Sequence, residues 1–133
     1  MRNILFRGKS LENNKWIYGT VEFHLVDGDL TRIKKDAFIT YDSMDKIGKV
    51  YRDRYEVNPD TVGQFTGSTD KNGAKIFEGD IVKQGDEIGT VRYEGNYCTF
   101  AVILNRNTDL FQHIEYGCEI LGNMLDNPEM LSR

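Results

Sequence analysis

Residues 62–82 read VGQFTGSTDKNGAKIFEGDIV, and this stretch decides the fold class. β-Branched and aromatic residues at 62–66 and 75–77 flank the polar run Asp70-Lys71-Asn72-Gly73, an order typical of a β-hairpin. The pair Asn72-Gly73 favours a type I′ turn, in which both central residues have a positive φ. Glu78-Gly79-Asp80 then predicts a second turn, which leads into a strand at 81–83. The stretch therefore predicts short antiparallel strands joined by tight turns.

The same pattern continues to the C-terminus. We expect strands at 89–93, 97–104, 112–116 and 119–122, with turns at 94–96 and 105–109. Asn127-Pro128-Glu129 has the form of an N-cap followed by a proline at the first helical position, which predicts one helical turn through Leu131. This spacing of short strands and turns suits a small barrel or strongly bent sheets. The run Glu78-Gly79-Asp80-Ile81-Val82, which opens a string of short strands, resembles the start of an SH3-like barrel, so we expect such a barrel over residues 57–133.

Short apolar and aromatic runs also dominate the first half of the chain. They predict strands at 3–7, 16–23, 24–26, 30–33, 37–41 and 49–57. Asp27-Gly28 suits a two-residue hairpin turn, residues 42–48 suit a loop or a single helical turn, and Asn58-Pro59 suits the start of a helical turn. We therefore expect a mainly β protein with few short helical turns. Residues 1–56 would form a hairpin and sheet region and residues 57–133 the barrel, an arrangement that one continuous domain also accommodates.

Composition narrows the class of protein. The chain has 133 residues, of which 39% are hydrophobic, 29% are charged and two are proline, which excludes a disordered or collagen-like chain. The longest purely apolar run, residues 100–104, is too short to cross a membrane, and no secretory signal follows Met1. We expect the two cysteines, Cys98 and Cys118, to be free thiols in a reducing cytoplasm. No membrane partner is expected.

Charge is unevenly placed along the chain. The net charge is −4, but residues 1–55 carry a net +3 and residues 56–133 a net −7. A net acidic chain is a poor candidate for nonspecific binding of nucleic acid, whose affinity comes mainly from neutralised phosphates. The net positive first half is the one feature of the charge that speaks for nucleic acid, and the opposite signs of the two halves also suit head-to-tail association of copies.

No motif points to catalysis or to a cofactor. His24 and His113 lack the spacing of metal ligands, and no spacing requires His113 to pair with a cysteine. Asp27-Gly28-Asp29 lacks the rest of a calcium-binding loop. The loop carboxylates of the second half could chelate a hard cation, but such residues more often cap turns; they are Glu78, Asp80, Asp86 and Glu87. The glycine-rich run at 67–73 is not a phosphate-binding loop. We expect no catalytic residue, no cofactor and no metal site, and thus a protein that is not an enzyme.

One stretch, residues 32–55, interleaves cations with aromatic residues. Sheets that bind single-stranded nucleic acid combine cationic grooves with stacking aromatics, so this stretch is the candidate surface for a partner or for nucleic acid. The candidate contacts are Arg32, Lys34, Lys35, Lys49, Tyr51, Arg52 and Arg54. Acidic residues interrupt the stretch, and a solvated sheet face explains the same composition.

Three blocks of sequence together resemble the YopX family of phage and prophage proteins. They read ILFRGK at 4–9 and KWIYG at 15–19; VNPDTVGQFTG at 57–67, DKNG at 70–73 and IFEGDIV at 76–82; and EILGN at 119–123 and DNPEML at 126–131. The resemblance implies a small phage-encoded protein made in a bacterial cytoplasm, and it brings no catalytic residues. Glycines recur where strands end or turn, so we interpret the shared motifs as a folding signature.

These observations lead to two hypotheses about function. The first is an accessory protein of a phage or prophage that binds another protein, or a second copy of itself. The alternative is a module that binds single-stranded nucleic acid through residues 32–55. Salt-dependent binding to single-stranded DNA or RNA separates the two.

Overall fold

The structure, a computed structural model, describes residues 4–26, 34–95, 98–104, 111–114 and 117–131. The expected class is confirmed, because antiparallel strands dominate the described residues and the helical segments are two short 3₁₀ helices. The Asp27-Gly28 turn and the strand expected at 30–33 lie outside the described residues. The chain divides into two compact units, residues 4–64 and residues 65–131, and each is described by itself. The expected regions 1–56 and 57–133 stay a prediction.

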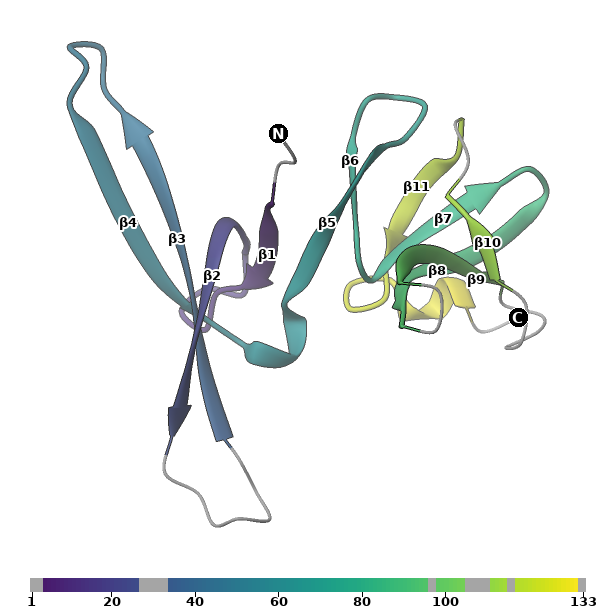
Figure 1. Ribbon diagram of the computed structural model, residues 1–133, viewed down its shortest axis with the longest axis horizontal. Helices are drawn as coiled ribbons and strands as arrows, with labels where there is room; N and C mark the ends of the chain where they lie inside the picture. The colour runs from purple at the N-terminus through teal and green to yellow at the C-terminus, as the bar shows by residue number, and fades with distance from the viewer. Residues whose placement is uncertain (1–3, 27–33, 96–97, 105–110, 115–116, 132–133) are drawn as a thin grey trace. The chain divides into compact units, whose positions relative to one another are not determined.

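The N-terminal unit is built on a twisted antiparallel sheet in the order β4-β3-β2-β1 (Figure 1). The first residues of β5, Gly63 and Gln64, add to the sheet beside β1. Asn58 caps the short helix η1 as expected, since its side chain accepts a hydrogen bond from the Asp60 N–H at 3.0 Å. The elements are β1 (Phe6–Lys9), β2 (Trp16–Val26), β3 (Lys34–Met44), β4 (Val50–Val57), η1 (Pro59–Thr61) and β5 (Gly63–Thr69).

The core of this unit lies on one face of β3 and β4. Ala37, Ile39 and Val57 are fully buried there, and side chains of β2 pack against them. Gly8 of β1 lies so close that a Cβ at this position would be 3.0 Å from Val57 Cγ2. The residues of β3 and β4 that alternate with the core positions face the other way, and they include Arg52 and Arg54.

The loop expected at 42–48 is partly wrong. Asp42, Ser43 and Met44 belong to β3 and pair with Arg52, Tyr51 and Val50. Only residues 45–49 form the turn, in which the Asp45 carboxylate accepts the N–H groups of Ile47 at 3.0 Å and Lys49 at 2.9 Å. The strand continues through Asp42, Ser43 and Met44 because each of them pairs with a residue of β4. This cross-strand pairing outweighs the low intrinsic strand propensity of Asp42.

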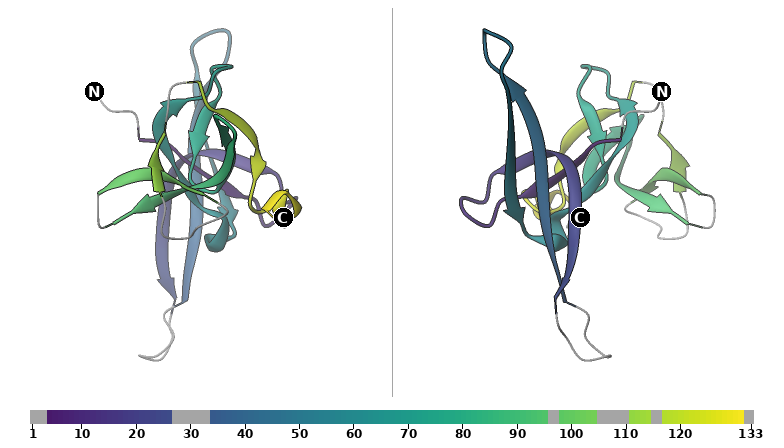
Figure 2. Two further views of the ribbon diagram at one scale, coloured as in Figure 1. Left: turned by 90° about the vertical axis from the view of Figure 1, so that its right-hand side faces the viewer. Right: turned by 60° about the vertical axis from the view of Figure 1, so that its left-hand side comes forward.

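The C-terminal unit holds a hairpin, β5–β6, and a five-stranded antiparallel sheet in the order β10-β9-β8-β7-β11. Figure 2 shows these strands, coloured from teal to yellow, from two further sides. Ile76, Val82, Val91, Val102 and Cys118 form its core. In the described part of the chain β10 and β11 remain the two edges of the sheet, so the SH3-like barrel is not confirmed. The elements are β6 (Lys75–Phe77), β7 (Asp80–Gln84), β8 (Glu87–Glu94), β9 (Thr99–Leu104), β10 (Phe111–His113), β11 (Glu119–Asn123) and the 3₁₀ helix η2 (Pro128–Leu131).

The β5–β6 turn differs in type from the expectation. Gly73 has a φ of +82°, as predicted, but Asn14 and Cys98 are the non-glycine residues with positive φ among those described, so Asn72 is not in that region. A type I′ turn needs a positive φ at both central residues and is therefore wrong here. The Gly73 N–H donates to the Asp70 carbonyl at 3.0 Å. Gly73, with its left-handed backbone, therefore closes a loop that is longer than a two-residue turn.

Candidate partner-binding surface

The structure separates the candidate residues of the stretch 32–55. Arg32 lies outside the described residues, and only the backbone of Lys34 is described. Strand alternation places Arg52 and Arg54 on one face of β4, as predicted, and Tyr51 on the other. The remaining cations lie over aromatic rings: Lys35 Nζ is 4.6 Å from the Phe23 ring centroid, and Lys49 Nζ is 5.3 Å from that of Tyr51. The cations whose side chains are described therefore divide into Arg52 and Arg54, which share a face of β4, and Lys35 and Lys49, which lie over aromatic rings.

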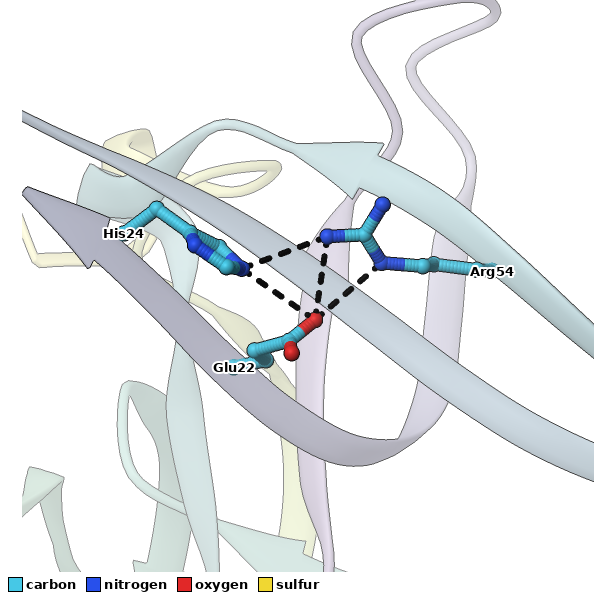
Figure 3. A network of polar contacts seen from close by, with 3 residues as sticks. All are labelled: Glu22, His24 and Arg54. Carbon is cyan, nitrogen blue, oxygen red and sulfur yellow. Dashed lines mark hydrogen bonds and ion pairs between the residues drawn. The ribbon is translucent and has the colours of Figure 1, made fainter. Parts of the chain in front are cut away.

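Arg54 is the centre of a polar network that joins β4 to β2 (Figure 3). Its Nε donates to Glu22 Oε1 at 3.1 Å, and its terminal nitrogen lies 3.0 Å from the same oxygen and 3.3 Å from His24 Nε2. The His24 ring and then the Arg54 guanidinium hydrogen-bond to Glu22, and together they lower the pKa of that carboxyl. The guanidinium carbon also lies 3.8 Å from the Phe38 ring centroid, a cation–π contact.

Arg52 has a carboxylate partner of its own. Its Nε donates to Asp42 Oδ1 at 2.9 Å across the β3–β4 ladder, and this hydrogen bond lowers the pKa of the Asp42 carboxyl. Both arginines of β4 are thus neutralised by acids of their own sheet. A nucleic-acid phosphate would have to compete with these carboxylates for the same nitrogens, which reduces the electrostatic gain of binding.

The β3–β4 hairpin extends beyond the rest of its sheet. Strand β2 pairs with β3 from Lys34 to Thr40, so residues 41–53 pair only with one another in the described structure (Figure 1). The end of this two-stranded segment carries exposed apolar side chains: Met44 is 68% exposed, Ile47 89% and Val50 60%. These residues were not among the candidates that the sequence indicated, although an isoleucine within a polar turn is a usable signal. Clustered exposed apolar residues are typical of binding surfaces.

Strand β4 also forms one edge of the sheet. Its last residues are covered, because Leu11 N–H donates to the Glu56 carbonyl at 3.1 Å and Asn58 N–H donates to the Lys9 carbonyl at 2.8 Å. Residues 50–55 have no neighbouring strand on this side within the described ranges. An open hollow of about 330 Å³ lies where the covered and uncovered parts meet; its lining residues are Ser10, Leu11, Glu12, Arg54, Tyr55 and Glu56.

The residues of the shared motifs serve the fold. Asp70 Oδ1 accepts the N–H groups of Asn72 and Ala74, both at 2.9 Å, while Oδ2 accepts that of Ile120 on β11 at 3.1 Å. Asp80 is 2% exposed and its Oδ2 accepts the Phe77 N–H at 2.8 Å. These carboxylates satisfy backbone donors in turns, which is a structural role.

The other motif blocks act in the same way. Thr61 Oγ1 accepts the Lys9 N–H at 2.8 Å, and Asn127 Oδ1 accepts that of Asn123 at 3.2 Å. Gly122 faces Asn127 so closely that a Cβ would be 2.4 Å from its Oδ1. The geometry therefore supports the interpretation of the motifs as a folding signature, and it directs attention to the surface of the β3–β4 hairpin.

The remaining chemistry-bearing groups are dispersed. Among the described residues, no three His, Cys, Asp or Glu side chains are placed to hold a metal ion together. Cys98 is exposed, Cys118 is buried, and both are free thiols. A pairing of His113 with a cysteine lies outside what is described, because the side chain of His113 is not. The 3₁₀ helices η1 and η2 are far too short to cross a membrane, and the described ranges hold no longer helix.

Comparison with known proteins adds a family and a fold. A family model described as "YopX protein" matches residues 5–132. The crystal structure of protein EF1440 from Enterococcus faecalis is similar in fold, with a TM-score of 0.53 and 17% sequence identity, and the match covers 98% of this chain and 99% of that one. No curated protein matches the chain. At this identity the structural likeness shows the fold alone.

Proposed function

The chain belongs to the YopX family, and from that premise we propose that it is a non-enzymatic accessory protein of a phage or prophage that acts by binding another protein chain. Its place of action is the cytoplasm of the bacterial host. The proposal includes an SH3-like architecture for residues 57–133, which would serve as a scaffold.

One observation carries the proposal. The hairpin segment 41–53 is two-stranded and ends in the exposed side chains of Met44, Ile47, Val50 and Tyr51. A two-stranded hairpin is at best marginally stable in water, and exposed apolar side chains gain free energy when a partner covers them. A partner that packs on this segment would supply both the missing strand contacts and the missing apolar cover.

A capture experiment tests this function. Tagged full-length chain is immobilised and offered an untagged copy of the same chain, and separately a lysate of bacteria that carry the prophage. We expect at least one of these to be retained by the wild type and lost by Ile47→Lys, because Ile47 is 89% exposed at the end of the hairpin.

The matched control is Leu125→Lys, which makes the same kind of change at a 48% exposed residue of the C-terminal unit. It should retain whatever the wild type retains. Equal retention by Ile47→Lys, or retention of nothing by the wild type, contradicts the proposal.

The alternative is a module for single-stranded nucleic acid, and a specific observation favours it. Tyr41 and Tyr55 stack at 5.8 Å on one face of the hairpin, which also carries Tyr51. The pairing of Arg52 and Arg54 with carboxylates argues against it. Fluorescence anisotropy with labelled single-stranded DNA and RNA decides: binding that weakens with salt and disappears when Lys49, Arg52 and Arg54 are all changed to Glu supports this alternative.

A further inference from the structure

The direction of the backbone groups of β4 follows from the bonds at its two ends. The Glu56 carbonyl and the Asn58 N–H point away from β3, towards Leu11 and Lys9. At the other end the Lys49 carbonyl points the opposite way and accepts the Asp45 N–H at 3.0 Å. Backbone groups alternate in direction along a strand, and the β3–β4 register has no irregularity. The N–H and C=O groups of Val50, Arg52 and Arg54 therefore point outward from the edge.

This edge has only part of the usual protection against pairing. Natural sheets protect an edge strand with proline, with a bulge, with charged side chains or by keeping it short. Strand β4 is eight residues long and has neither a proline nor a bulge. Of its charged residues, Arg52, Asp53, Arg54 and Glu56, the two arginines are paired with acids of the same sheet. The outward backbone groups of this edge can therefore pair with one more antiparallel strand.

Charge decides which strand fits. A foreign acidic strand would gain little, because the arginines are already paired. A second copy of β4 can pair with the first across a two-fold axis. The residue that lies on this axis sets the register and so determines which residues of the two strands lie opposite one another. An axis at Arg52 places Arg52 opposite the partner's Arg52. An axis at Asp53 places Asp53 opposite the partner's Asp53, and Arg52 opposite the partner's Arg54. Like charges directly opposite destabilise a ladder.

An axis at Tyr51 avoids these conflicts. It places Tyr51 opposite the partner's Tyr51, and Lys49 opposite the partner's Asp53, twice over by symmetry. Aromatic pairs and pairs of opposite charge are the favourable cross-strand pairs. Val50 then lies opposite the partner's Arg52, and their outward backbone groups exchange hydrogen bonds.

The same register covers the exposed end of the hairpin. The turn 45–49 of one copy lies alongside the part of β4 that begins at Asp53 in the other copy. The hollow lined by Leu11, Glu12 and Glu56 lies at that part of the strand. The turn of one copy therefore lies next to the hollow of the other. Ile47 of the turn can contact Leu11, which is 59% exposed, and the cation Lys46 can pair with the carboxylates of Glu12 and Glu56.

We infer that the chain forms a two-fold dimer in which the β4 strands of two copies pair antiparallel, centred on Tyr51. This inference rests on the proposed function and names its partner, a second copy of the chain. The hairpin is then the dimer interface, and the two sheets join into one ladder across the axis.

Disulfide trapping tests the register directly. In a Cys98→Ser background, Tyr51→Cys places two thiols opposite each other in a pair without backbone hydrogen bonds, at a Cα separation of about 4.5 Å. Mild oxidation should convert most of this variant to a covalent dimer. Asp53→Cys is the matched control, since its two copies lie about 14 Å apart in this register, beyond the reach of a disulfide. Trapping of Asp53→Cys in place of Tyr51→Cys overturns the inference.

Sedimentation of the full chain tests the edge without added cysteines. The wild type should be dimeric, and Val50→Pro should be monomeric because it removes an outward N–H that none of the described strands of the same chain uses. Val50→Thr keeps that N–H and should remain dimeric. Circular dichroism verifies that both variants are folded.

A charge exchange identifies the partner residues. Lys49→Glu and Asp53→Lys should each weaken the dimer about tenfold or more, because each places like charges opposite one another twice. The double variant restores the opposite charges and should restore the dimer. A wild type that stays monomeric at every concentration, while still capturing another protein through Ile47, overturns the dimer and leaves the proposed function standing.

Discussion

Replacing Asp70 by Asn isolates one long-range hydrogen bond of the C-terminal unit. Asp70 is 7% exposed, and its two oxygens have different partners. Oδ1 serves the loop through Asn72 and Ala74, and Oδ2 serves Ile120, which lies 50 positions away in the sequence. The Asn oxygen can keep the two loop bonds, but its NH₂ group then opposes the Ile120 N–H. The substitution therefore removes one of the bonds between the β5–β6 loop and β11, while the Lys71–Glu119 ion pair and the bond from the Lys71 N–H to the Cys118 carbonyl remain.

The expected cost follows from the burial of the donor. Asn72 and Ala74 are exposed and can turn to water, whereas the Ile120 N–H loses an ionised acceptor in a half-buried position. A hydrogen bond to a charged group contributes about 1.5–3 kcal/mol. With a urea dependence of about 1–2 kcal/mol/M, the midpoint of unfolding should fall by about 1–2 M. Far-UV circular dichroism measures it, and Asp86→Asn, at an exposed turn of the same unit, is the charge-matched control.

The pH dependence gives a second, independent check. The Ile120 N–H, followed by those of Ala74 and Asn72, lowers the pKa of Asp70 below its ordinary value. A lowered folded-state pKa contributes stability that is fully present above the unfolded pKa, about 3.9, and is lost as the pH falls through the folded pKa. The gap between wild type and Asp70→Asn should therefore be constant above about pH 5 and narrow below about pH 4. Equal midpoints at neutral pH, or a gap that widens in acid, would refute the assigned role of this carboxylate.

Three further predictions follow from single positions. Gly73→Val should lower the free energy of unfolding by about 1–2 kcal/mol, since φ is +82° there and a Cβ meets nothing within 4 Å, so backbone strain is the whole effect; an unchanged urea midpoint contradicts the turn. Gly122→Ala should cost about 1–3 kcal/mol because its Cβ displaces the Asn127 side chain and the bond that it accepts; a thermal midpoint equal to that of the wild type excludes this close approach. Thiol titration should find one fast-reacting group in the native protein, Cys98, and a second, Cys118, only after denaturation without reductant; finding no thiol in the denatured protein contradicts two free cysteines.

The sequence predicted the elements whose signals are local. The strands around Phe65 and Ile76, the glycine turn at Gly73 and the Asn58 cap each depend on a few neighbouring residues, and the structure has all of them. The length of β3 was not predictable in this way. Asp42 and Ser43 have the composition of a loop, and only their pairing with β4 makes them strand.

The candidate surface shows the same division between local and distant effects. Alternation along β4 correctly placed Arg52 and Arg54 on one face. Their neutralisation was hidden, because the carboxylate that pairs with Arg54 is Glu22, 32 positions earlier in the chain. Whether a cationic stretch is available to a phosphate depends on sheet register, and a single sequence does not contain that register.

The pairing of β11 with β7 has a consequence for biosynthesis. β11 is the last of the described strands in chain order, yet it covers the edge of a strand that is made much earlier. A ribosome therefore releases β5 to β9 before either β11 or the Ile120 partner of Asp70 exists. During that interval the edge of β7 is open to strands of other nascent chains. A chaperone that holds unpaired strands would find its substrate here, and translation that stalls before Glu119 would prolong the exposure.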